Sequence, residues 1–219
     1  MCKPIKLIPD KKTSYITQND ECYYFLNYLP GGGYSASKDN DLIFNFKKDI
    51  KYKNTNSWSY KTAAIKKFAD MLHIALNGRF CTIIPMPTSK PRGSQKFDDR
   101  LDQVVLFLGK MSTNYDIQLC LDVKEECLPA HNYGVRSPEI LLQNIIFAQS
   151  LDTPKENIIL VDDILTTGGH FKAAKNVILK KYPKKNVIGF FLGKTLCVEE
   201  DIVPPIDISN IIINTKLID

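Results

Sequence analysis

The chain alternates between two periods of hydrophobic residues, one typical of helices and one typical of buried strands. Over 59–77 apolar residues recur every three or four positions, which predicts an amphipathic helix that ends at Gly78. The short aliphatic runs 80–84 and 157–161 are typical of strands that are covered on both faces of a sheet. The same two periods predict further helices over 94–110 and 168–181 and further strands over 117–123 and 186–192.

The alternation of strands and helices over 58–194 predicts an α/β core with a parallel sheet and right-handed crossovers. Residues 195–219 are predicted to form a tail, which Pro204 and Pro205 interrupt and in which 208–213 is a candidate edge strand. Because ligands of open α/β sheets bind beyond the carboxyl ends of the strands, we expect a site at that edge of the core.

Residues 1–57 differ from the core and are predicted to be rich in strands. Aromatic and β-branched residues gather at 23–26 and at 42–46, and the Pro-Gly-Gly-Gly run at 30–33 between them is a strong breaker. A hairpin with a long loop is the natural interpretation, with 42–46 as a half-buried strand. We therefore treat this segment as an N-terminal extension of the core.

The composition of the chain is typical of a folded globular protein rather than of a disordered, membrane-spanning or zinc-binding one. With 219 residues, of which 44% are hydrophobic and 24% charged, the chain can bury a core and is not predicted to be disordered. No apolar run reaches the roughly 18–20 residues that span a membrane, and the first residues lack a signal-peptide core. We therefore expect a cytoplasmic protein without a membrane partner. The six cysteines include no C-x-x-C pair, so we expect reduced thiols rather than a zinc site.

The net charge of +5 is mild, and it fits anionic ligands as well as an ordinary lysine-rich surface. The sequence contains no helix-turn-helix pattern with a basic recognition helix, so direct binding to nucleic acid is not expected. Candidate chemistry must therefore come from local motifs.

The most informative segment is 157–171, Asn-Ile-Ile-Leu-Val-Asp-Asp-Ile-Leu-Thr-Thr-Gly-Gly-His-Phe. A strand leads to the adjacent carboxylates Asp162 and Asp163, then to a Thr-Thr-Gly-Gly turn and a helix. Glycines let backbone N–H groups approach an anion, and the start of the helix adds unpaired N–H groups and the positive end of its dipole. Because a phosphate would repel them at contact distance, the two carboxylates are expected to face sugar hydroxyls or a magnesium ion.

A purely structural interpretation of this segment stays open. Thr167 or Asp163 could serve only as an N-cap of the helix. The P-loop pattern G-x-x-x-x-G-K-[ST] and the dinucleotide pattern G-x-G-x-x-G are both absent from the sequence, so neither of those nucleotide sites is predicted.

A second candidate anion site follows the strand at 80–84. The segment 82–93 combines prolines and hydroxyl groups with the cations Lys90 and Arg92, and Ser89 lies beside them. A solvated basic loop would have the same composition, so this segment alone does not establish a site. Arg100, a turn into the next predicted helix, is a weaker candidate.

At these residues the chain resembles the type I phosphoribosyltransferases, most strongly over 158–170 and more loosely over 59–194. The family motif is an aliphatic strand, two acidic residues, two variable residues, then Thr-Thr-Gly and two small or hydroxylated residues. The resemblance implies a Rossmann-like, parallel-sheet core of that fold, with the strand-rich extension 1–57 acting as a hood. It implies that Asp162 and Asp163 hold the ribose 2′ and 3′ hydroxyls. The residues implied to wrap the 5′-phosphate are Thr166, Thr167, Gly168, Gly169 and His170.

Two positions in this motif bear on the ligand. The last loop position is usually Thr or Ser, whereas here it is His170, which can donate a hydrogen bond or leave that role to its backbone N–H. Purine salvage enzymes of the hypoxanthine-guanine type carry a carboxylate at the position of Thr166, so this chain lacks that candidate general base. A hypoxanthine or guanine substrate is therefore not expected, and the sequence does not name the base.

The pattern Pro-x-Pro followed by basic residues and Arg-Gly over 85–93 resembles the ComF-like branch of the family, which is known from DNA-uptake operons. That resemblance implies that Lys90 and Arg92, with Ser89 nearby, contact pyrophosphate. It also associates the chain with DNA uptake or DNA processing.

The segment 124–138 has no clear period, and related enzymes use a mobile loop here that closes over the reaction. It carries Lys124, His131, Tyr133 and Arg136, of which Arg136 is a candidate substrate contact. An ordinary surface connection is the alternative.

The implied reaction displaces pyrophosphate from C1′ of phosphoribosyl pyrophosphate (PRPP) by a nitrogen base, or runs in reverse. Mg²⁺ held by Asp162 and Asp163, directly or through water, would neutralise charge on the leaving group. Besides this transferase, a PRPP- or nucleotide-sensing module without the chemistry stays open, and so does another phosphate-binding protein or a sugar-phosphate hydrolase. A homodimer or a complex with a partner protein is compatible with each of them.

Overall fold

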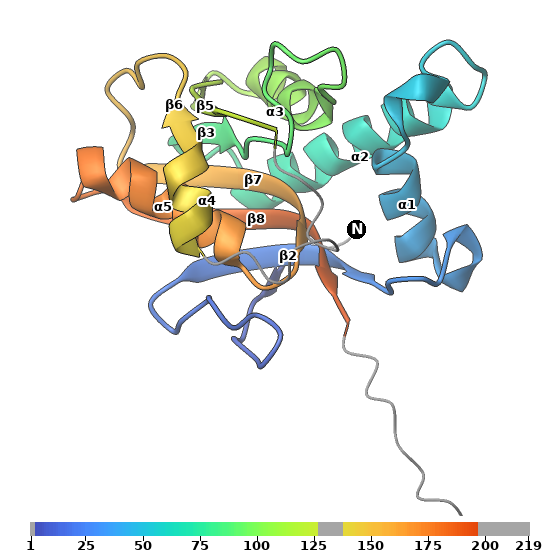
Figure 1. The fold of residues 1–219 in the computed structure, drawn as a ribbon, viewed down its shortest axis with the longest axis horizontal. Helices are drawn as coiled ribbons and strands as arrows, with labels where there is room; N and C mark the ends of the chain where they lie inside the picture. Colours follow the sequence, from blue (N-terminus) through green and yellow to red (C-terminus); the bar gives the residue numbers. More distant parts are fainter. Residues whose placement is uncertain (1–2, 127–137, 197–219) are drawn as a thin grey trace, which may run out of the picture.

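The computed structural model describes residues 3–126 and 138–196, which form a mixed α/β fold (Figure 1). Six strands make the main sheet: β1 (Ile5–Lys6), β2 (Glu21–Tyr28), β3 (Cys81–Pro85), β4 (Tyr115–Ile117), β7 (Asn157–Leu165) and β8 (Asn186–Thr195). Their order is β1-β2-β8-β7-β3-β4, and every neighbouring pair except β1–β2 is parallel. The α/β class and the mostly parallel sheet predicted from the sequence are confirmed.

Five α-helices accompany the sheet within the described ranges. They are α1 (Lys38–Phe46), α2 (Trp58–Leu76), α3 (Arg100–Met111), α4 (Pro138–Asn144) and α5 (Gly169–Lys181). Two short 3-10 helices flank α1, at Tyr34–Ala36 and Ile50–Tyr52, and β5 (Leu121–Val123) pairs with β6 (Ile145–Phe147) in a small antiparallel sheet. None of the helices that the structure describes has the length and hydropathy to cross a bilayer.

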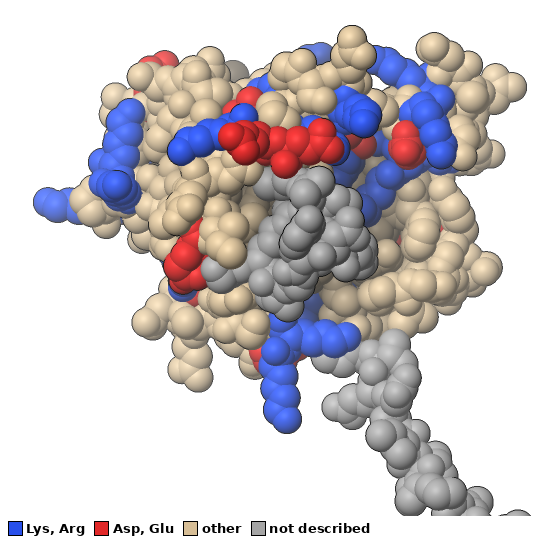
Figure 2. All heavy atoms as spheres, in the orientation of Figure 1, with Lys and Arg blue, Asp and Glu red and all other residues tan. Residues whose placement is uncertain are grey.

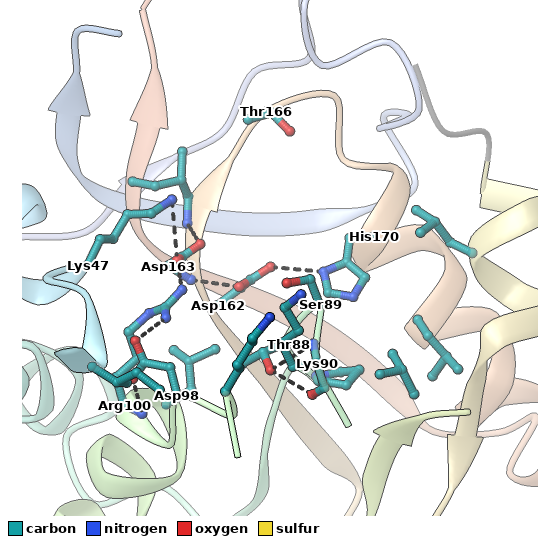
Figure 3. Close-up of a pocket in the computed structure, with 18 of the residues that line it drawn as sticks. Lys47, Thr88, Ser89, Lys90, Asp98, Arg100, Asp162, Asp163, Thr166 and His170 are labelled. Atoms are coloured by element: carbon teal, nitrogen blue, oxygen red, sulfur yellow. Dashed lines mark hydrogen bonds and ion pairs between the residues drawn. The ribbon is translucent and has the colours of Figure 1, made fainter. Parts of the chain in front are cut away.

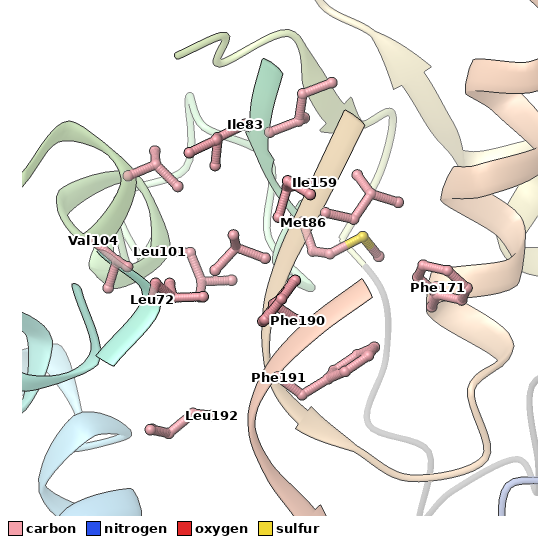
Figure 4. Close-up of a cluster of buried hydrophobic side chains, with 14 of the residues drawn as sticks. Leu72, Ile83, Met86, Leu101, Val104, Ile159, Phe171, Phe190, Phe191 and Leu192 are labelled. Carbon is pink, nitrogen blue, oxygen red and sulfur yellow. The ribbon is translucent and has the colours of Figure 1, made fainter. Parts of the chain in front are cut away.

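The central strands β3 and β7 have continuous apolar runs because helices cover both of their faces. All five residues of β3 are buried. Figure 4 shows Leu72, Leu101 and Val104, from α2 and α3, on one side of the strands, and Phe171 of α5 on the other. The register pairs the last residue of β3 with the residue before Asp162, so the loop after β3 starts beside the carboxylates.

Residues 42–46 belong to helix α1, so the strand and the hairpin predicted there are wrong. Ser37 caps this helix, because its hydroxyl accepts a hydrogen bond from the N–H of Asn40 (3.0 Å). Ile43 and Phe46 are both fully buried, and their spacing of three residues fits a helical stripe. Five residues are too few to separate the two periods, and the cap lies outside the run on which the prediction was based.

The predicted strand at 23–26 is present as β2, but it joins the main sheet. It pairs in parallel with β8 from Glu21↔Ile188 to Tyr28↔Thr195. The N-terminal segment therefore contributes a strand to the same sheet as the core, and its role as a hood stays a prediction.

Two further elements have other bounds than predicted. The helix expected over 94–110 begins only at Arg100, after a turn in which the N–H of Phe97 donates to the carbonyl of Ser94 (2.9 Å). The single strand expected over 117–123 is divided between β4 and β5, which lie in different sheets. The candidate edge strand 208–213, with nearly all of the tail, lies outside the described residues.

Three of the six cysteines, Cys22, Cys81 and Cys120, are buried free thiols. Burial raises the pKa of Cys22 to about 12 and the pKa of each of the other two to about 11. These three thiols are thus protonated and unreactive near neutral pH. The remaining cysteines lie outside the described residues.

Asp20 links the N-terminal segment to α5 through ion pairs with two lysines. Its side chain is 1% exposed and accepts hydrogen bonds from the ammonium groups of Lys172 (2.5 Å) and Lys175 (2.8 Å). Thr17 donates two more, from its hydroxyl (2.9 Å) and its N–H (3.0 Å). Burial by itself raises the pKa of Asp20, but these hydrogen bonds hold it well below its ordinary value.

We expect Asp20→Asn to lower the free energy of unfolding at pH 7 by about 3 kcal/mol, because two lysines lose their buried carboxylate. The pKa of Asp20 is lower in the folded state than its unfolded value of 3.8. The contribution of Asp20 to the free energy of unfolding is therefore fully present above pH 3.8 and is lost as the pH falls from 3.8 towards the folded pKa. Urea unfolding at pH 7 and at acid pH should show the deficit shrinking in acid. Asp70→Asn, at an exposed position of α2, is the control. An equal deficit at both pH values would contradict this account.

Candidate functional site

A cavity of about 1330 Å³ opens where β3 and β7 end (Figure 3). The end of α1, the loop after β3, the start of α3 and the turn before α5 all contribute to its lining. Its charged lining residues have both signs: Lys47, Asp49, Lys51, Lys90, Lys96, Asp98, Arg100, Asp162 and Asp163. The cavity thus lies at the edge where open parallel sheets bind their ligands.

The surface outside the cavity has no single sign of charge on the face seen in Figure 2. Basic side chains lie on several sides of a row of acidic side chains there. The electrostatic potential over this face would therefore attract an anionic ligand less than the charged residues that line the cavity.

The turn 166–170 is shaped by a left-handed glycine and by contacts with the N-terminal segment. Gly168 has a φ of 83°, in the left-handed region that glycine adopts without strain. A Cβ at this position would collide with the side chain of Ile16, which packs against the turn. The N–H of Tyr15 donates to the carbonyl of Thr167 (3.1 Å), so the N-terminal segment helps to fix the turn.

The five predicted phosphate contacts lie together on this turn, but only three of them line the cavity. These three are Thr166, Thr167 and His170, whereas Gly168 and Gly169 could contribute only backbone N–H groups. Helix α5 begins at Gly169, whose N–H donates to Oγ1 of Thr167 (3.4 Å), and the next N–H groups of the helix and the positive end of its dipole lie at the turn. The turn therefore offers hydroxyl, imidazole and backbone donors to an anion.

The two carboxylates of the motif face different neighbours, because successive side chains of a strand point to opposite faces. One oxygen of Asp162 lies 3.6 Å from Nδ1 of His170, and the other accepts the N–H of Asp163 (2.7 Å). Asp163 is directed towards Arg100 and Lys47 instead (Figure 3). Both carboxylates line the cavity, but only Asp162 lies close to the phosphate-type turn.

Asp163 is a charge that the protein itself neutralises. Its Oδ2 lies 2.6 Å from Nη2 of Arg100 and 3.5 Å from Nζ of Lys47, and its Oδ1 accepts the N–H of Ile164 (2.6 Å). Burial alone would raise the pKa of Asp163, but Lys47 and Arg100 hold it well below its ordinary value. Asp163 is therefore ionised near neutral pH, and most of its acceptor capacity is already used.

A buried lysine, Lys61, holds in place the segments that carry Arg100 and Lys47. Lys61, whose side chain is 0% exposed, donates to Oδ2 of Asp98 (2.6 Å) and to the carbonyl of Lys48 (2.7 Å). Asp98 in turn binds Nη1 of Arg100 (2.7 Å). Burial lowers the pKa of Lys61, and Asp98 opposes that shift. One ammonium thus ties α2 to the end of α1 and to the start of α3, which carry the two cations that face Asp163.

The predicted pyrophosphate loop is only partly directed into the cavity. Thr88, Ser89 and Lys90 line it, and the ammonium of Lys90 pairs with Glu126. Arg92 does not line it.

Arg92 instead connects two other parts of the core. Its guanidinium pairs with Asp102 of α3, and its N–H lies 3.2 Å from both carboxylate oxygens of Asp122. The structure therefore brings Ser89 and Lys90, but not Arg92, to the site. Arg136 and most of the predicted lid, residues 127–137, lie outside the described residues.

The two cations that face Asp163 are not among the site residues that the sequence predicts. The sequence makes Arg100 only a weaker candidate, although its place at the first residue of α3 brings it to Asp163. Lys47 directly follows the run 42–46, which the sequence predicts to be a strand, whereas the helix that ends at Phe46 puts Lys47 at the cavity. The Ser37 cap was the signal that could have revealed both that helix and its last turn.

The residues present fit a magnesium ion only in part. Within 3–126 and 138–196, no group of three or more His, Cys, Asp and Glu side chains is arranged to hold a metal. Because Arg100 and Lys47 engage Asp163, Asp162 is the carboxylate that could take a ligand position. Mg²⁺ often binds through one or two carboxylates together with water and substrate phosphates, so a ligand-dependent ion is compatible with this site.

Comparisons with known proteins add little to this geometry. No protein-family model matches the chain, and no curated protein sequence matches it. Among solved structures, a hypoxanthine phosphoribosyltransferase from Staphylococcus aureus is similar at 13% identity, with 62% of this chain and 74% of that chain covered and a TM-score of 0.33. A likeness this distant assigns neither an activity nor a substrate, and it does not bear on the ComF-like branch.

We expect Arg100→Met to lower the free energy of unfolding at pH 7 by about 3 kcal/mol, because Asp98 and Asp163 lose their shared cation. Adding Asp163→Asn should recover part of that loss, with a coupling of about 1–3 kcal/mol in a double-mutant cycle. Urea unfolding of the four proteins measures both quantities. Lys96→Met, which also removes a cation of the lining, should change stability little. Strictly additive effects of the two substitutions would contradict the pairing.

Proposed function

We propose that this chain binds PRPP with Mg²⁺ and transfers the phosphoribosyl group to or from a nitrogen base. One observation carries the proposal: Asp162, the turn 166–170 and the loop 87–90 contribute to the lining of a single cavity of about 1330 Å³. The resemblance of 158–170 to the type I phosphoribosyltransferase motif supports the same assignment. The mostly parallel sheet is compatible with that fold.

The 5′-phosphate is assigned to the turn 166–170. The hydroxyls of Thr166 and Thr167 and the N–H groups at the start of α5 are its donors. Protonated His170 would add a positive charge. Since Asp162 lies 3.6 Å from His170, a ribose attached to this phosphate would pass its carboxylate, which can accept hydrogen bonds from the sugar hydroxyls.

Asp163 is assigned a supporting role, which differs from the role that the family resemblance implies. Its oxygens are engaged by Arg100, Lys47 and the N–H of Ile164. We therefore assign contact with the sugar hydroxyls mainly to Asp162. Asp163 would hold Arg100 and Lys47 at the cavity, where their remaining donors can face an anionic ligand.

Mg²⁺ would be held by Asp162, through water or directly. When bound, the ion supplies positive charge to the pyrophosphate as the C1′–O bond weakens. Ser89 and Lys90 lie on the loop that would receive the pyrophosphate, and Lys90 would exchange Glu126 for it.

In the proposed transfer, a base nitrogen forms a bond to C1′ while the bond from C1′ to the pyrophosphate oxygen breaks. The bonding electron pair leaves with pyrophosphate, and the base gives up its N–H proton to solvent. The chain contributes positioning and charge rather than a nucleophile. Asp162 orients the sugar, and the turn 166–170 fixes its 5′ end.

A second candidate function is a PRPP- or nucleotide-sensing module that retains the sugar-phosphate site without the chemistry. The observation that favours it is that both predicted pyrophosphate cations already face carboxylates, Lys90 with Glu126 and Arg92 with Asp102. A sensor needs no ordered contacts to a leaving group.

The wider biological setting belongs to the same proposal. We retain the ComF-like association with DNA uptake or processing, a cytoplasmic location and a hood role for residues 1–57. Position 166 is a threonine, whereas purine salvage enzymes of the hypoxanthine-guanine type carry a carboxylate there, and this difference favours a base other than hypoxanthine or guanine. A homodimer or a partner protein is compatible with each of these proposals.

We expect calorimetric titration with PRPP and Mg²⁺ to show binding that Asp162→Asn weakens about tenfold to a hundredfold, because charged hydrogen bonds to the sugar are lost. Asp70→Asn, on the exposed face of α2, is the matched control and should bind as the wild type does. Failure of well-folded wild-type protein to bind PRPP would overturn the proposal.

Pyrophosphate release, assayed on the same samples with a panel of nitrogen bases, separates the two candidate functions. A transferase should release pyrophosphate with at least one base, and Asp162→Asn should slow that release by about 10²–10³. Binding of PRPP without release for any base would favour the sensor.

A further inference from the structure

A second, smaller hollow adjoins the main cavity on the side of α1. Its volume is about 260 Å³, and we call it the aromatic hollow after four of its lining residues, Tyr28, Tyr34, Phe44 and Tyr52. Lys47 and Asp49 line both the hollow and the main cavity. The two spaces therefore share a boundary, and a single ligand could occupy both.

Two rings of the aromatic hollow, Tyr34 and Tyr52, lie outside the buried core. Tyr34 and Tyr52 are 47% and 42% exposed, whereas Phe46, on the same helix as Phe44, is fully buried. Phe44 packs against Tyr34 and Tyr28 with ring centroids 5.1 and 6.1 Å apart, which fixes one wall. Partly exposed aromatic rings beside a cavity are typical of a stacking site for a flat ring. Nζ of Lys48 lies 6.0 Å from the centroid of Tyr34 and Nζ of Lys51 lies 5.2 Å from the centroid of Tyr52, so a ligand ring would displace these ammonium groups or use the opposite ring faces.

The size and polar groups of the hollow limit its ligand. Pockets for drug-sized ligands have volumes of about 300–1,000 Å³, so this hollow suits one flat ring system. Oδ1 of Asp49 accepts the N–H of Lys51 (2.8 Å). In the part of the chain that the structure describes, Oδ2 of Asp49 has no hydrogen-bond partner, so it can accept one from a ligand N–H.

The order of groups across the site matches that of a nucleotide. Lys47 and His170 lie on opposite sides of Asp162 and Asp163 in Figure 3, and Nζ of Lys47 is 3.5 Å from Asp163. A phosphate at the turn 166–170 would place a ribose over the carboxylates. A ring attached to that ribose would then be directed to the boundary formed by Lys47 and the aromatic hollow.

We propose that the aromatic hollow binds the heteroaromatic ring of a nucleoside monophosphate whose sugar phosphate occupies the main cavity. Tyr34 and Tyr52 stack on the ring, and Asp49 accepts a hydrogen bond from a ring or amino N–H. This inference rests on the proposed function, because it assigns the base or nucleotide end of the same site.

The experiment compares ligands with and without the ring on the same protein. Titration calorimetry measures the affinity for ribose 5-phosphate and for adenosine, guanosine, cytidine and uridine 5′-monophosphates. At least one nucleotide should bind about tenfold to a hundredfold more tightly than ribose 5-phosphate, which is the usual gain from one stacked base.

Variants locate the source of that gain. Tyr34→Ala and Tyr52→Ala should remove most of the advantage of the nucleotide while leaving the affinity for ribose 5-phosphate unchanged, and that unchanged affinity shows that the variants are folded. Tyr52→Phe should retain the advantage, because it keeps the ring. Phe80→Ala is the matched control, since Phe80 is 68% exposed and lines neither the hollow nor the main cavity.

The possible failures are distinguishable. Ribose 5-phosphate binding with no gain for any of the four nucleotides would overturn the assignment of the hollow and leave the proposed function intact. A gain that Phe80→Ala lowers as much as Tyr52→Ala would also overturn it. If neither ribose 5-phosphate nor any nucleotide binds, the hollow and the proposed function fail together.

Discussion

The site depends on the burial of one negative charge, the carboxylate of Asp163. Its side chain is only 13% exposed, and a charge in such a place is costly unless cations face it. Arg100 and Lys47 supply those cations from α3 and from the end of α1, which are distant in sequence. Neutralising Asp163 therefore determines how α1, α3 and β7 meet, and so determines one side of the cavity.

This constraint also separates the roles of the two adjacent acids. Successive side chains of β7 point to opposite faces, so Asp163 is directed towards α3 and Asp162 towards α5 and His170. Among the described residues, no lysine or arginine pairs with Asp162. Asp162 is thus left to a ligand, whereas Asp163 organises cations. Lys61 extends the arrangement inward, because a fully buried ammonium between Asp98 and the carbonyl of Lys48 joins the two elements that carry those cations.

The sequence predicted the parts of the molecule that local patterns determine. Continuous apolar strands, the period of α2 and α5 and the glycine turn at Gly168 all depend on neighbours within a few residues. Long-range choices were not predictable in the same way. The run 42–46 fits a strand and a helix equally, and its buried face exists only because Ile43 and Phe46 pack into the core. Tertiary packing likewise determines the partners of Arg92 and Arg100. Arg92, the stronger candidate from the sequence, pairs with Asp102 away from the cavity, whereas Arg100, the weaker candidate, pairs with Asp163 at the cavity.

The measurement that tests the central claim most directly is an NMR titration of ¹⁵N-labelled protein with ribose 5-phosphate. If the turn before α5 binds the phosphate, the backbone amides of Gly168, Gly169 and His170 should show the largest chemical-shift changes, in proportion to occupancy. Amides of α3 and α4 distant from the cavity should shift little. No change at the turn at saturating ligand, or changes concentrated on another surface, would contradict the account.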